Sequence, residues 1–451
     1  MKRVLTRDFT LTFREGNDTI NITFFERKRL FCRGARVLYM ETVSLKDRNR
    51  LRELAAKKAA MAHCARNDEI LAMWHAQAKG VRDTPPVRLL FSNFPNEVVM
   101  NRLLCEGKDA RGLEKRLLTS MVGRELFDDD TPISDRLEIS LFAGAYPFGK
   151  RPNLLRAKDS IGFHIEPLTD DIEADFDIFC GGTFSADLDA TKPYCAWVDE
   201  IIGDILPTKI VMGSLTGAIT NPLVMLINME TYYLAMYDSP ETLHKIMDMA
   251  TNVYERYYDF LEEKKLLLPT NDYSLVCQES FGFTDELPSE GPITSTKQLW
   301  GFLESQETTA VSPETYGEFV YPYQDRLVKR YGLLSYGCCE RVDALWEDYL
   351  SKWENLRKLS VSPFNNERQV GEYLRGTRVV YYSKPRAEFV TNPGPMNEDA
   401  LRAYFREVCE AASGCLFEMA QREVGTIFGD YNRGKRYVEI AKESIAKYWK
   451  P

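Results

Sequence analysis

The sequence predicts an α/β protein built as a (β/α)8 barrel of the TIM type, preceded by an N-terminal β-hairpin and a helical extension. Three short apolar runs near the C-terminus each stop at small or reactive residues, with helix-like sequence between them: Gly332–Glu340, Lys358–Pro363 and Val379–Pro385. This alternation is typical of consecutive β/α units. A break at Asp83–Pro86 marks the start of the barrel. We therefore expect an extension at residues 1–84 and a barrel at residues 85–451.

The composition restricts the class of protein. The chain has 451 residues and is 44% hydrophobic, which allows a large core, and its net charge of −9 argues against nucleic acid or an anionic membrane as partner. The N-terminus lacks the apolar core of a signal peptide, and the longest apolar stretch, Ile210–Met229, is interrupted by polar residues and Pro222. The ten cysteines are therefore expected to be reduced thiols of a cytoplasmic protein.

The N-terminal extension is predicted to hold a hairpin and a helix. Apolar residues alternate along residues 8–26 on both sides of Glu15–Asp18, which favours an antiparallel hairpin. A second strand pair fits the sequence up to Tyr39. Residues Ser44–Lys79 have helical periodicity and composition.

The barrel strands are predicted from their apolar runs. In addition to the three runs above, the candidates are Val87–Ser92, Leu137–Tyr146, Val211–Gly217, Tyr273–Glu279 as the fourth strand, and Cys415–Ala420 as the eighth. Ser239 and Ser312, each followed by proline, predict helix starts, the second helix running to Lys329, and Arg436–Trp449 predicts a closing helix. An irregular insertion is expected at about residues 150–206.

Two adjacent thiols, Cys338 and Cys339, follow the predicted fifth strand. In a parallel barrel the carboxyl ends of the strands form the rim that carries the chemistry, so these thiols can bind a metal or act as nucleophiles. The alternative is that both are small core residues. A zinc site needs further ligands, and the candidate carboxylates near this rim are Glu279, Glu307, Glu340, Glu418 and Glu423.

Other residues are candidates for acid–base chemistry or substrate binding. Asp285, next to Glu286, and Glu279 can transfer a proton, and Tyr336 precedes the thiols. From the sequence alone, a solvated helix start is the safer interpretation of the acidic pair. Among the four histidines, His164 lies in the insertion, where it can reach a pocket. Candidates for binding an anionic or phenolic substrate lie at the end of the seventh strand: Tyr381, Tyr382, Lys384 and Arg386. The alternative is that the tyrosines belong to the core and the cations are solvated. Dinucleotide, Walker and hydrolase-elbow motifs are absent.

A series of segments, in order and spacing, carries a family resemblance. They are Met236–Glu241, Phe283–Pro288, Leu299–Phe302, Ser305–Glu307, Val311–Glu314, Tyr336–Glu340, Val361–Pro363 and Ser383–Pro385. With them, residues 85–445 resemble the uroporphyrinogen decarboxylase superfamily, in particular its corrinoid-methyltransferase branch. Two positions differ from those relatives, which carry histidines where this chain has Tyr336 and Gly425. The arginine-rich motif of the decarboxylase has no match at Phe91–Asn96.

The resemblance implies a distorted barrel, often dimeric, with its site at the carboxyl rim and a zinc ion held partly by Cys338. We therefore expect a homodimeric methyltransferase that acts on a small methylated substrate, with zinc held by Cys338, Cys339 and Glu307 and with cobalamin carried by a partner protein. The chain has no cobalamin-binding Asp-x-His-x-x-Gly segment of its own. The alternatives are a metal-free decarboxylase or other lyase, and a non-catalytic barrel that binds a ligand.

Overall fold

The computed structural model describes residues 10–15, 18–23, 40–156 and 163–451. Its chain divides into two compact units, residues 1–37 and residues 38–451. In the first unit, β1 (Thr10–Glu15) and β2 (Asp18–Thr23) pair antiparallel, with Glu15 opposite Asp18, so the predicted hairpin is present. The second strand pair, predicted up to Tyr39, lies outside the described residues. The division at residue 84 stays a prediction.

The second unit is an α/β structure around a seven-stranded parallel sheet. Its order is β10-β13-β14-β15-β16-β17-β3. The strands are β3 (Val87–Leu89), β10 (Leu215–Thr216), β13 (Trp300–Leu303), β14 (Leu333–Tyr336), β15 (Leu356–Val361), β16 (Val380–Ser383) and β17 (Leu416–Gln421). Because all seven are parallel, their carboxyl ends lie at one edge.

A separate parallel pair adjoins this sheet along the chain. β4 (Leu137–Ser140) pairs with β9 (Thr208–Val211), and β9 leads directly to β10. No strand pairing joins β3 to β4 within the described residues. The arrangement is consistent with a barrel, and its closure into eight strands stays a prediction.

The predicted fourth strand is wrong. Residues 273–279 do not enter the parallel sheet; they contain β11 (Leu275–Cys277), which turns at Glu279, φ 70°, and pairs antiparallel with β12 (Ser280–Phe281). The strand that follows β10 in the parallel sheet is β13 instead. Gly301 is required there, because a Cβ atom would lie 2.0 Å from the ring of Tyr331.

The two faces of the sheet differ in what covers them. Tyr336, Leu359 and Phe417 belong to the main core, while Tyr382 and Ala420 pack with Leu90, Phe302 and Cys277 in a small cluster. Neighbouring residues on a strand thus face opposite sides. Arg88, Lys358 and Tyr382, from three strands, hydrogen-bond to the β11–β12 hairpin, so it lies on the inner face.

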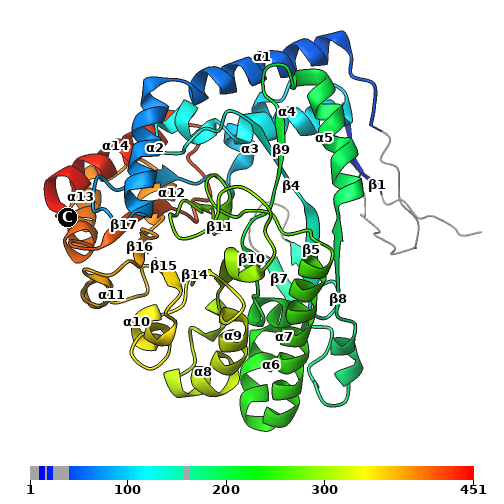
Figure 1. The fold of residues 1–451 in the computed structure, drawn as a ribbon, viewed down its shortest axis with the longest axis vertical. Coiled ribbons are helices and arrows are strands. Elements are labelled where there is room, and N and C mark those ends of the chain that lie inside the picture. Colours follow the sequence, from blue (N-terminus) through cyan, green and yellow to red (C-terminus); the bar gives the residue numbers. More distant parts are fainter. Residues whose placement is uncertain (1–9, 16–17, 24–39, 157–162) are drawn as a thin grey trace, which may run out of the picture. The chain divides into compact units, whose positions relative to one another are not determined.

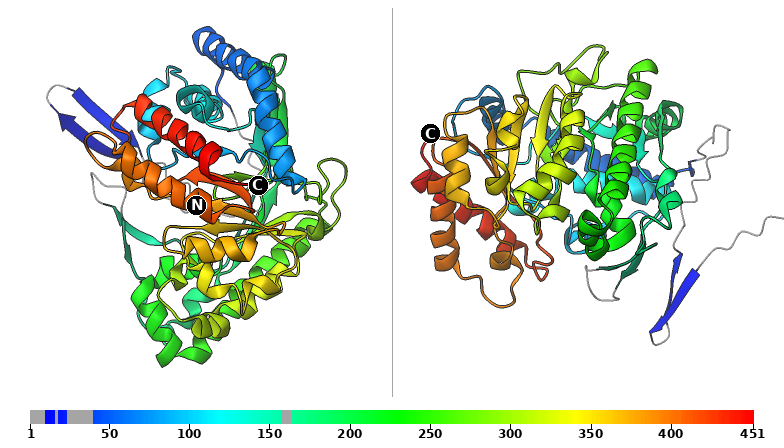
Figure 2. Two further views of the ribbon diagram at one scale, coloured as in Figure 1. Left: turned by 90° about the vertical axis from the view of Figure 1, so that its left-hand side faces the viewer. Right: turned by 90° about the horizontal axis from the view of Figure 1, so that it is seen from below.

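Helices surround the sheet, most of them on its outer face (Figure 1). They are α1 (Leu45–Ala62), α2 (Ala65–Ala78), α3 (Pro95–Val98), α4 (Lys108–Thr119), α5 (Leu188–Ile202), α6 (Thr220–Asp238), α7 (Pro240–Glu263), α8 (Pro313–Phe319), α9 (Tyr321–Val328), α10 (Val342–Leu345), α11 (Glu367–Leu374), α12 (Glu388–Thr391), α13 (Glu398–Ala411) and α14 (Tyr431–Tyr448). Figure 2 shows α13 and α14, in orange and red, side by side. None of the helices in the described ranges has the length and apolarity to cross a bilayer.

Three predicted segments are more finely divided than expected. The helix at 44–79 is two helices, because α1 ends at Ala62 and α2 starts at Ala65, and the helix after Ser312 breaks at Val320. The insertion is not irregular throughout. It contains the antiparallel pair β6 (Asn153–Arg156) with β7 (Phe163–Glu166), and β8 (Thr183–Asp187), which pairs antiparallel with β5 (Phe142–Tyr146) from the end of the predicted second strand.

Helix α2 lies at the amino end of the sheet. The side-chain amide of Gln77 donates to the carbonyl of Phe417 in β17 at 3.0 Å, and Trp74 packs edge-on against Phe281 with ring centroids 5.3 Å apart. The opposite edge is therefore the one on which a site can open.

Candidate active site at the carboxyl edge of the sheet

Cys338 and Cys339 lie at the carboxyl edge because the chain turns directly after β14. Gly337 has φ +101°, a conformation that L side chains rarely adopt, and a Cβ there would lie 3.2 Å from Cβ of Ser360. The Sγ atoms of the two cysteines are 3.7 Å apart. The sequence prediction that the thiols follow a strand at this edge is confirmed.

The two thiols are chemically different. The hydrogen bond with Cys338 lowers the pKa of Cys339, while the same bond and burial raise the pKa of Cys338. Cys338 is buried and Cys339 is partly exposed. Of the two sulfurs, that of Cys339 is therefore the one that loses its proton first as the pH rises.

Lys384 follows β16 and lies beside the thiols. Its side chain is 6% exposed, its Nζ donates to the carbonyl of Cys338 at 3.3 Å, and it lies 5.4 Å from the ring of Tyr382. Burial lowers the pKa of Lys384 and the thiol of Cys338 raises it. The predicted substrate-binding residue Tyr382 is buried, and its hydroxyl donates to the carbonyl of Gln278.

Arg422, which the sequence prediction missed, follows β17 at the same edge. The pKa of Arg422 is raised against the opposing effect of burial, by Tyr382, Cys338 and the carboxylates of Glu423 and Glu279. The predicted catalytic residue Glu279 is thus near this arginine. The position of Arg422, just after the predicted strand Cys415–Ala420, was the sequence signal that could have identified it. We call Cys338, Cys339, Lys384 and Arg422 the rim cluster.

Two buried carboxyl groups lie beside the thiols. Glu340 accepts hydrogen bonds from the N–H groups of Cys338 and Ser305, at 2.6 and 2.8 Å, and fixes the turn. Glu304, a second residue that the prediction missed, follows β13 and is 5% exposed. Burial, Glu307 and Glu340 raise the pKa of Glu304 well above its usual value. Glu304 therefore keeps its proton at a pH where exposed glutamates have lost it.

The fit to zinc is partial. Two thiolates bound at about 2.3 Å to one tetrahedral zinc lie about 3.8 Å apart, so the Cys338–Cys339 separation of 3.7 Å suits two ligand positions. The predicted third ligand, Glu307, accepts hydrogen bonds from Thr220 and Asn221 at 2.8 and 2.7 Å. Across the described ranges, no three His, Cys, Asp or Glu side chains are grouped as a metal site. A complete zinc site is not formed by these residues.

Three other predicted residues are not brought to the rim cluster. Tyr336 faces the helices, where its hydroxyl bonds to Ser305 and Tyr316, because it is an outward position of β14. Asp285 pairs with Arg378 at 2.8 Å, near the carbonyl of Ala78 in α2, at the amino end of the sheet. His164 is exposed on β7 in the insertion.

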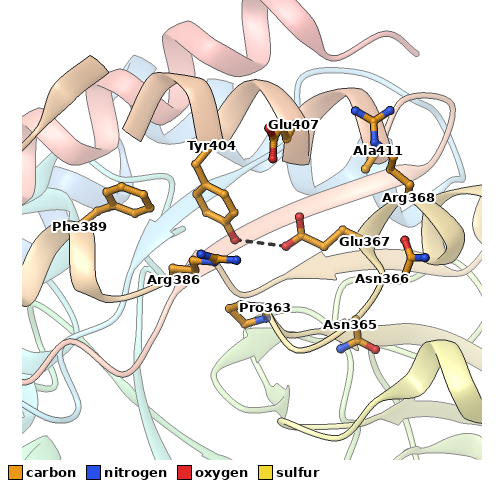
Figure 3. A pocket seen from close by; sticks show the side chains of 10 residues that line it. All are labelled: Pro363, Asn365, Asn366, Glu367, Arg368, Arg386, Phe389, Tyr404, Glu407 and Ala411. Carbon is orange, nitrogen blue, oxygen red and sulfur yellow. Dashed lines mark hydrogen bonds between the residues drawn. The ribbon is translucent and has the colours of Figure 1, made fainter. Parts of the chain in front are cut away.

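Arg386 lies in a separate pocket of about 430 Å³ between α11, α12 and α13. Figure 3 shows Arg386, Tyr404 and Glu367 around this pocket, with the Tyr404 hydroxyl donating to Glu367 at 3.2 Å. Burial raises the pKa of Glu367. Lys384 and Arg386, predicted to bind one substrate together, thus belong to different places.

Neither a protein-family model nor a curated protein matches the sequence. Among solved structures, a methyltransferase from Methanosarcina mazei is similar, with a TM-score of 0.49 and 13% identity, over 83% of this chain and 98% of that one. A likeness this distant carries no argument about activity, which has to come from the residues of the rim cluster.

Proposed function

We propose that this protein is a methyltransferase that moves a methyl group between a small O- or N-methylated compound and a corrinoid carried by a partner protein. The reaction would take place at the rim cluster. The observation that carries the proposal is the pair of unlike thiols at the carboxyl edge, beside a buried lysine. It agrees with the sequence resemblance, in which Cys338 corresponds to a cysteine of the reaction centre.

Glu304 is proposed as the proton donor. When a methyl group leaves oxygen or nitrogen, the bond from carbon to that atom breaks and the departing atom takes up a proton. A carboxyl group with a raised pKa can supply this proton near neutral pH. Glu304 has such a pKa and lies close enough to Cys338 for the two groups to interact electrostatically. In the reverse direction Glu304 takes the proton back.

The thiols are proposed to position the methylated atom, with Cys339 as the softer and more ionised sulfur. Zinc at the two thiols remains a proposal, because these residues supply two ligands only. The steps above therefore do not pass through a metal. The homodimer also stays a proposal.

A metal-free decarboxylase or other lyase is the second candidate. The specific observation in its favour is the pair of cations, Lys384 and Arg422, which suits a carboxylate substrate without a metal. This candidate predicts release of CO2 from a carboxylated compound and no change in a corrinoid. A non-catalytic ligand-binding barrel predicts neither.

The test is a methyl-transfer assay with reduced cobalamin and a panel of O- and N-methylated compounds. We expect the absorption spectrum of the corrinoid to change from the reduced to the methylated form. Glu304→Gln should slow this change by about 10²–10⁴-fold, the usual contribution of a general acid. CO2 release without methyl transfer would replace the proposal with the lyase.

A further inference from the structure

Lys384 is a buried cation that has no carboxylate partner among the described residues. Its ammonium makes one hydrogen bond, of 3.3 Å, to a backbone carbonyl. In the described part of the chain no carboxylate lies within 4.0 Å of it. Lys358 on the neighbouring strand shows the contrast, because its Nζ lies 3.0 Å from Glu418 and 2.6 Å from Ser280 Oγ. A buried ammonium is normally paired in this second way.

Arg422 adds a second cation with unused hydrogen-bonding capacity. Its Nε atom is buried and has no hydrogen-bond partner within the described residues. Its single ion pair there is long, 3.7 Å from Nη2 to the exposed Glu423. Glu279 contributes a further carboxylate charge nearby, yet Arg422 still lies close enough to Lys384 to lower the pKa of that lysine. The protein thus holds two cations together beside its thiols.

The backbone around these cations is also unusual. Glu423, directly after Arg422, has φ 59°, and Glu279 has φ 70°. Left-handed conformations of residues other than glycine cost free energy and cluster at functional sites. The arginine side chain is 18% exposed and Cys339 is partly exposed, so this part of the rim cluster borders solvent, whereas Lys384 and the Nε atom of Arg422 are buried behind it.

We propose that Lys384 Nζ and Arg422 Nε bind a carboxylate of the substrate and so place the remainder of the molecule against Cys339. The inference rests on the proposed function and narrows its substrate to methylated compounds that also carry a carboxylate. The carboxylate supplies a charged oxygen partner for Lys384 and the acceptor that Arg422 Nε lacks. A neutral isostere such as an amide can accept from Arg422 Nε but brings no charge to Lys384, and it is therefore disfavoured.

The test compares two alkylating reagents of similar size, iodoacetate and iodoacetamide, on the full-length protein. The rate of modification of each cysteine is followed by peptide mass spectrometry, and Cys180, an exposed thiol, serves as internal reference. We expect the iodoacetate-to-iodoacetamide rate ratio to be at least about tenfold higher at Cys339 than at Cys180, because one charge-assisted contact is worth about 1.4 kcal/mol.

Variants identify the source of the preference. Lys384→Met should bring the ratio at Cys339 close to that at Cys180, and Lys384→Arg should keep most of it. Arg422→Gln should reduce it independently. Lys329→Met, at an exposed lysine paired with Asp325, is the matched control and should leave the ratio unchanged. Circular dichroism spectra confirm that each variant is folded.

Three results of the alkylation test would overturn the inference. The first is an equal ratio at Cys339 and Cys180, and the second is a preference that survives Lys384→Met. The third is a Cys339 that neither reagent modifies, since a carboxylate could then not reach the cations. Methyl transfer from neutral compounds with no carboxylate preference would remove this inference and leave the proposed function intact. A strong preference for iodoacetate at Cys339 without any methyl transfer would keep the carboxylate site and remove the proposed function.

Discussion

The same substitution at two buried lysines should change stability in opposite directions. Lys358 and Lys384 lie on or directly after neighbouring strands, β15 and β16, and both are almost fully buried. Methionine has a similar length and removes only the ammonium, so neither variant creates a large cavity. What differs is the partner, because Lys358 is paired with Glu418 and Lys384 is not.

The magnitude at Lys358 follows from what it leaves behind. Glu418 is 0% exposed, Ser280 donates to its Oε2 atom at 2.9 Å, and its Oε1 atom has no partner within the described residues. Removal of the lysine would therefore leave a buried carboxylate with one hydrogen bond. Loss of one partner of a buried ion pair costs about 3–5 kcal/mol, so we expect Lys358→Met to lower the free energy of unfolding by this amount.

The magnitude at Lys384 has the other sign. An incompletely satisfied buried polar group costs about 1–3 kcal/mol, and loss of the long bond to the Cys338 carbonyl takes back about 0.5–1.5 kcal/mol. We expect Lys384→Met to raise the free energy of unfolding by about 1 kcal/mol. The two variants should thus differ by about 4 kcal/mol or more.

Urea unfolding, followed by tryptophan fluorescence at several pH values, measures both variants. The folded-state pKa of Lys384 is lowered below 10.5 by burial. Between the folded-state pKa of Lys384 and its ordinary value of 10.5 in the unfolded chain, the unfolded chain keeps a proton that the folded protein has lost. The stability of the wild type should therefore rise with pH in this range. Lys384→Met should lack this rise. The reasoning is refuted if Lys384→Met destabilises by more than about 1 kcal/mol, or if Lys358→Met costs less than that.

Three further predictions concern the site. Cys338→Ala should raise the pH at which Cys339 is alkylated, because the hydrogen bond that lowers the pKa of Cys339 is lost. If the thiols hold zinc, Cys338→Ala should also lose bound metal, measured by inductively coupled plasma mass spectrometry, and Cys339→Ala should lose less of it. Burial raises the pKa of Glu304, so the folded protein retains a proton that the unfolded chain releases above about pH 4.5, and stability should fall with rising pH there; Glu304→Gln should abolish this fall in urea midpoints. Asp285→Asn should leave methyl transfer unchanged and shift unfolding by less than about 1 kcal/mol, since its ion pair with Arg378 is 45% exposed; a large loss of activity would return Asp285 to the site.

Strands were predictable where an apolar run ends at polar or reactive residues. The rule finds β14, β15, β16 and β17, and with them the edge that carries Cys338 and Lys384. It fails at β13, whose four residues contain a glycine that only the packing of Tyr331 explains. The failure also hid Glu304, because a residue just after an unrecognised strand does not stand out.

The direction of a side chain was less predictable than its position along the chain. Tyr336 ends β14 and faces the helices, whereas Cys338, two residues later, lies at the rim because Gly337 reverses the backbone. A sequence does not specify such a reversal unless the torsion angle is known. Asp285 follows the predicted strand at residues 273–279, which would bring it to the carboxyl edge; in the structure the β11–β12 hairpin returns the chain to the amino end.

The pairing of β17 with β3 has a consequence for the time that synthesis takes. Met419 pairs with Val87, about 330 residues earlier. At about 5–20 residues per second, β3 emerges from the ribosome roughly 15–65 s before the strand that completes its ladder. During that interval one edge of β3 has unsatisfied backbone groups and can pair with a neighbouring nascent chain. Slow translation or a crowded polysome should therefore lower the yield of this protein more than that of one whose first strand pairs locally.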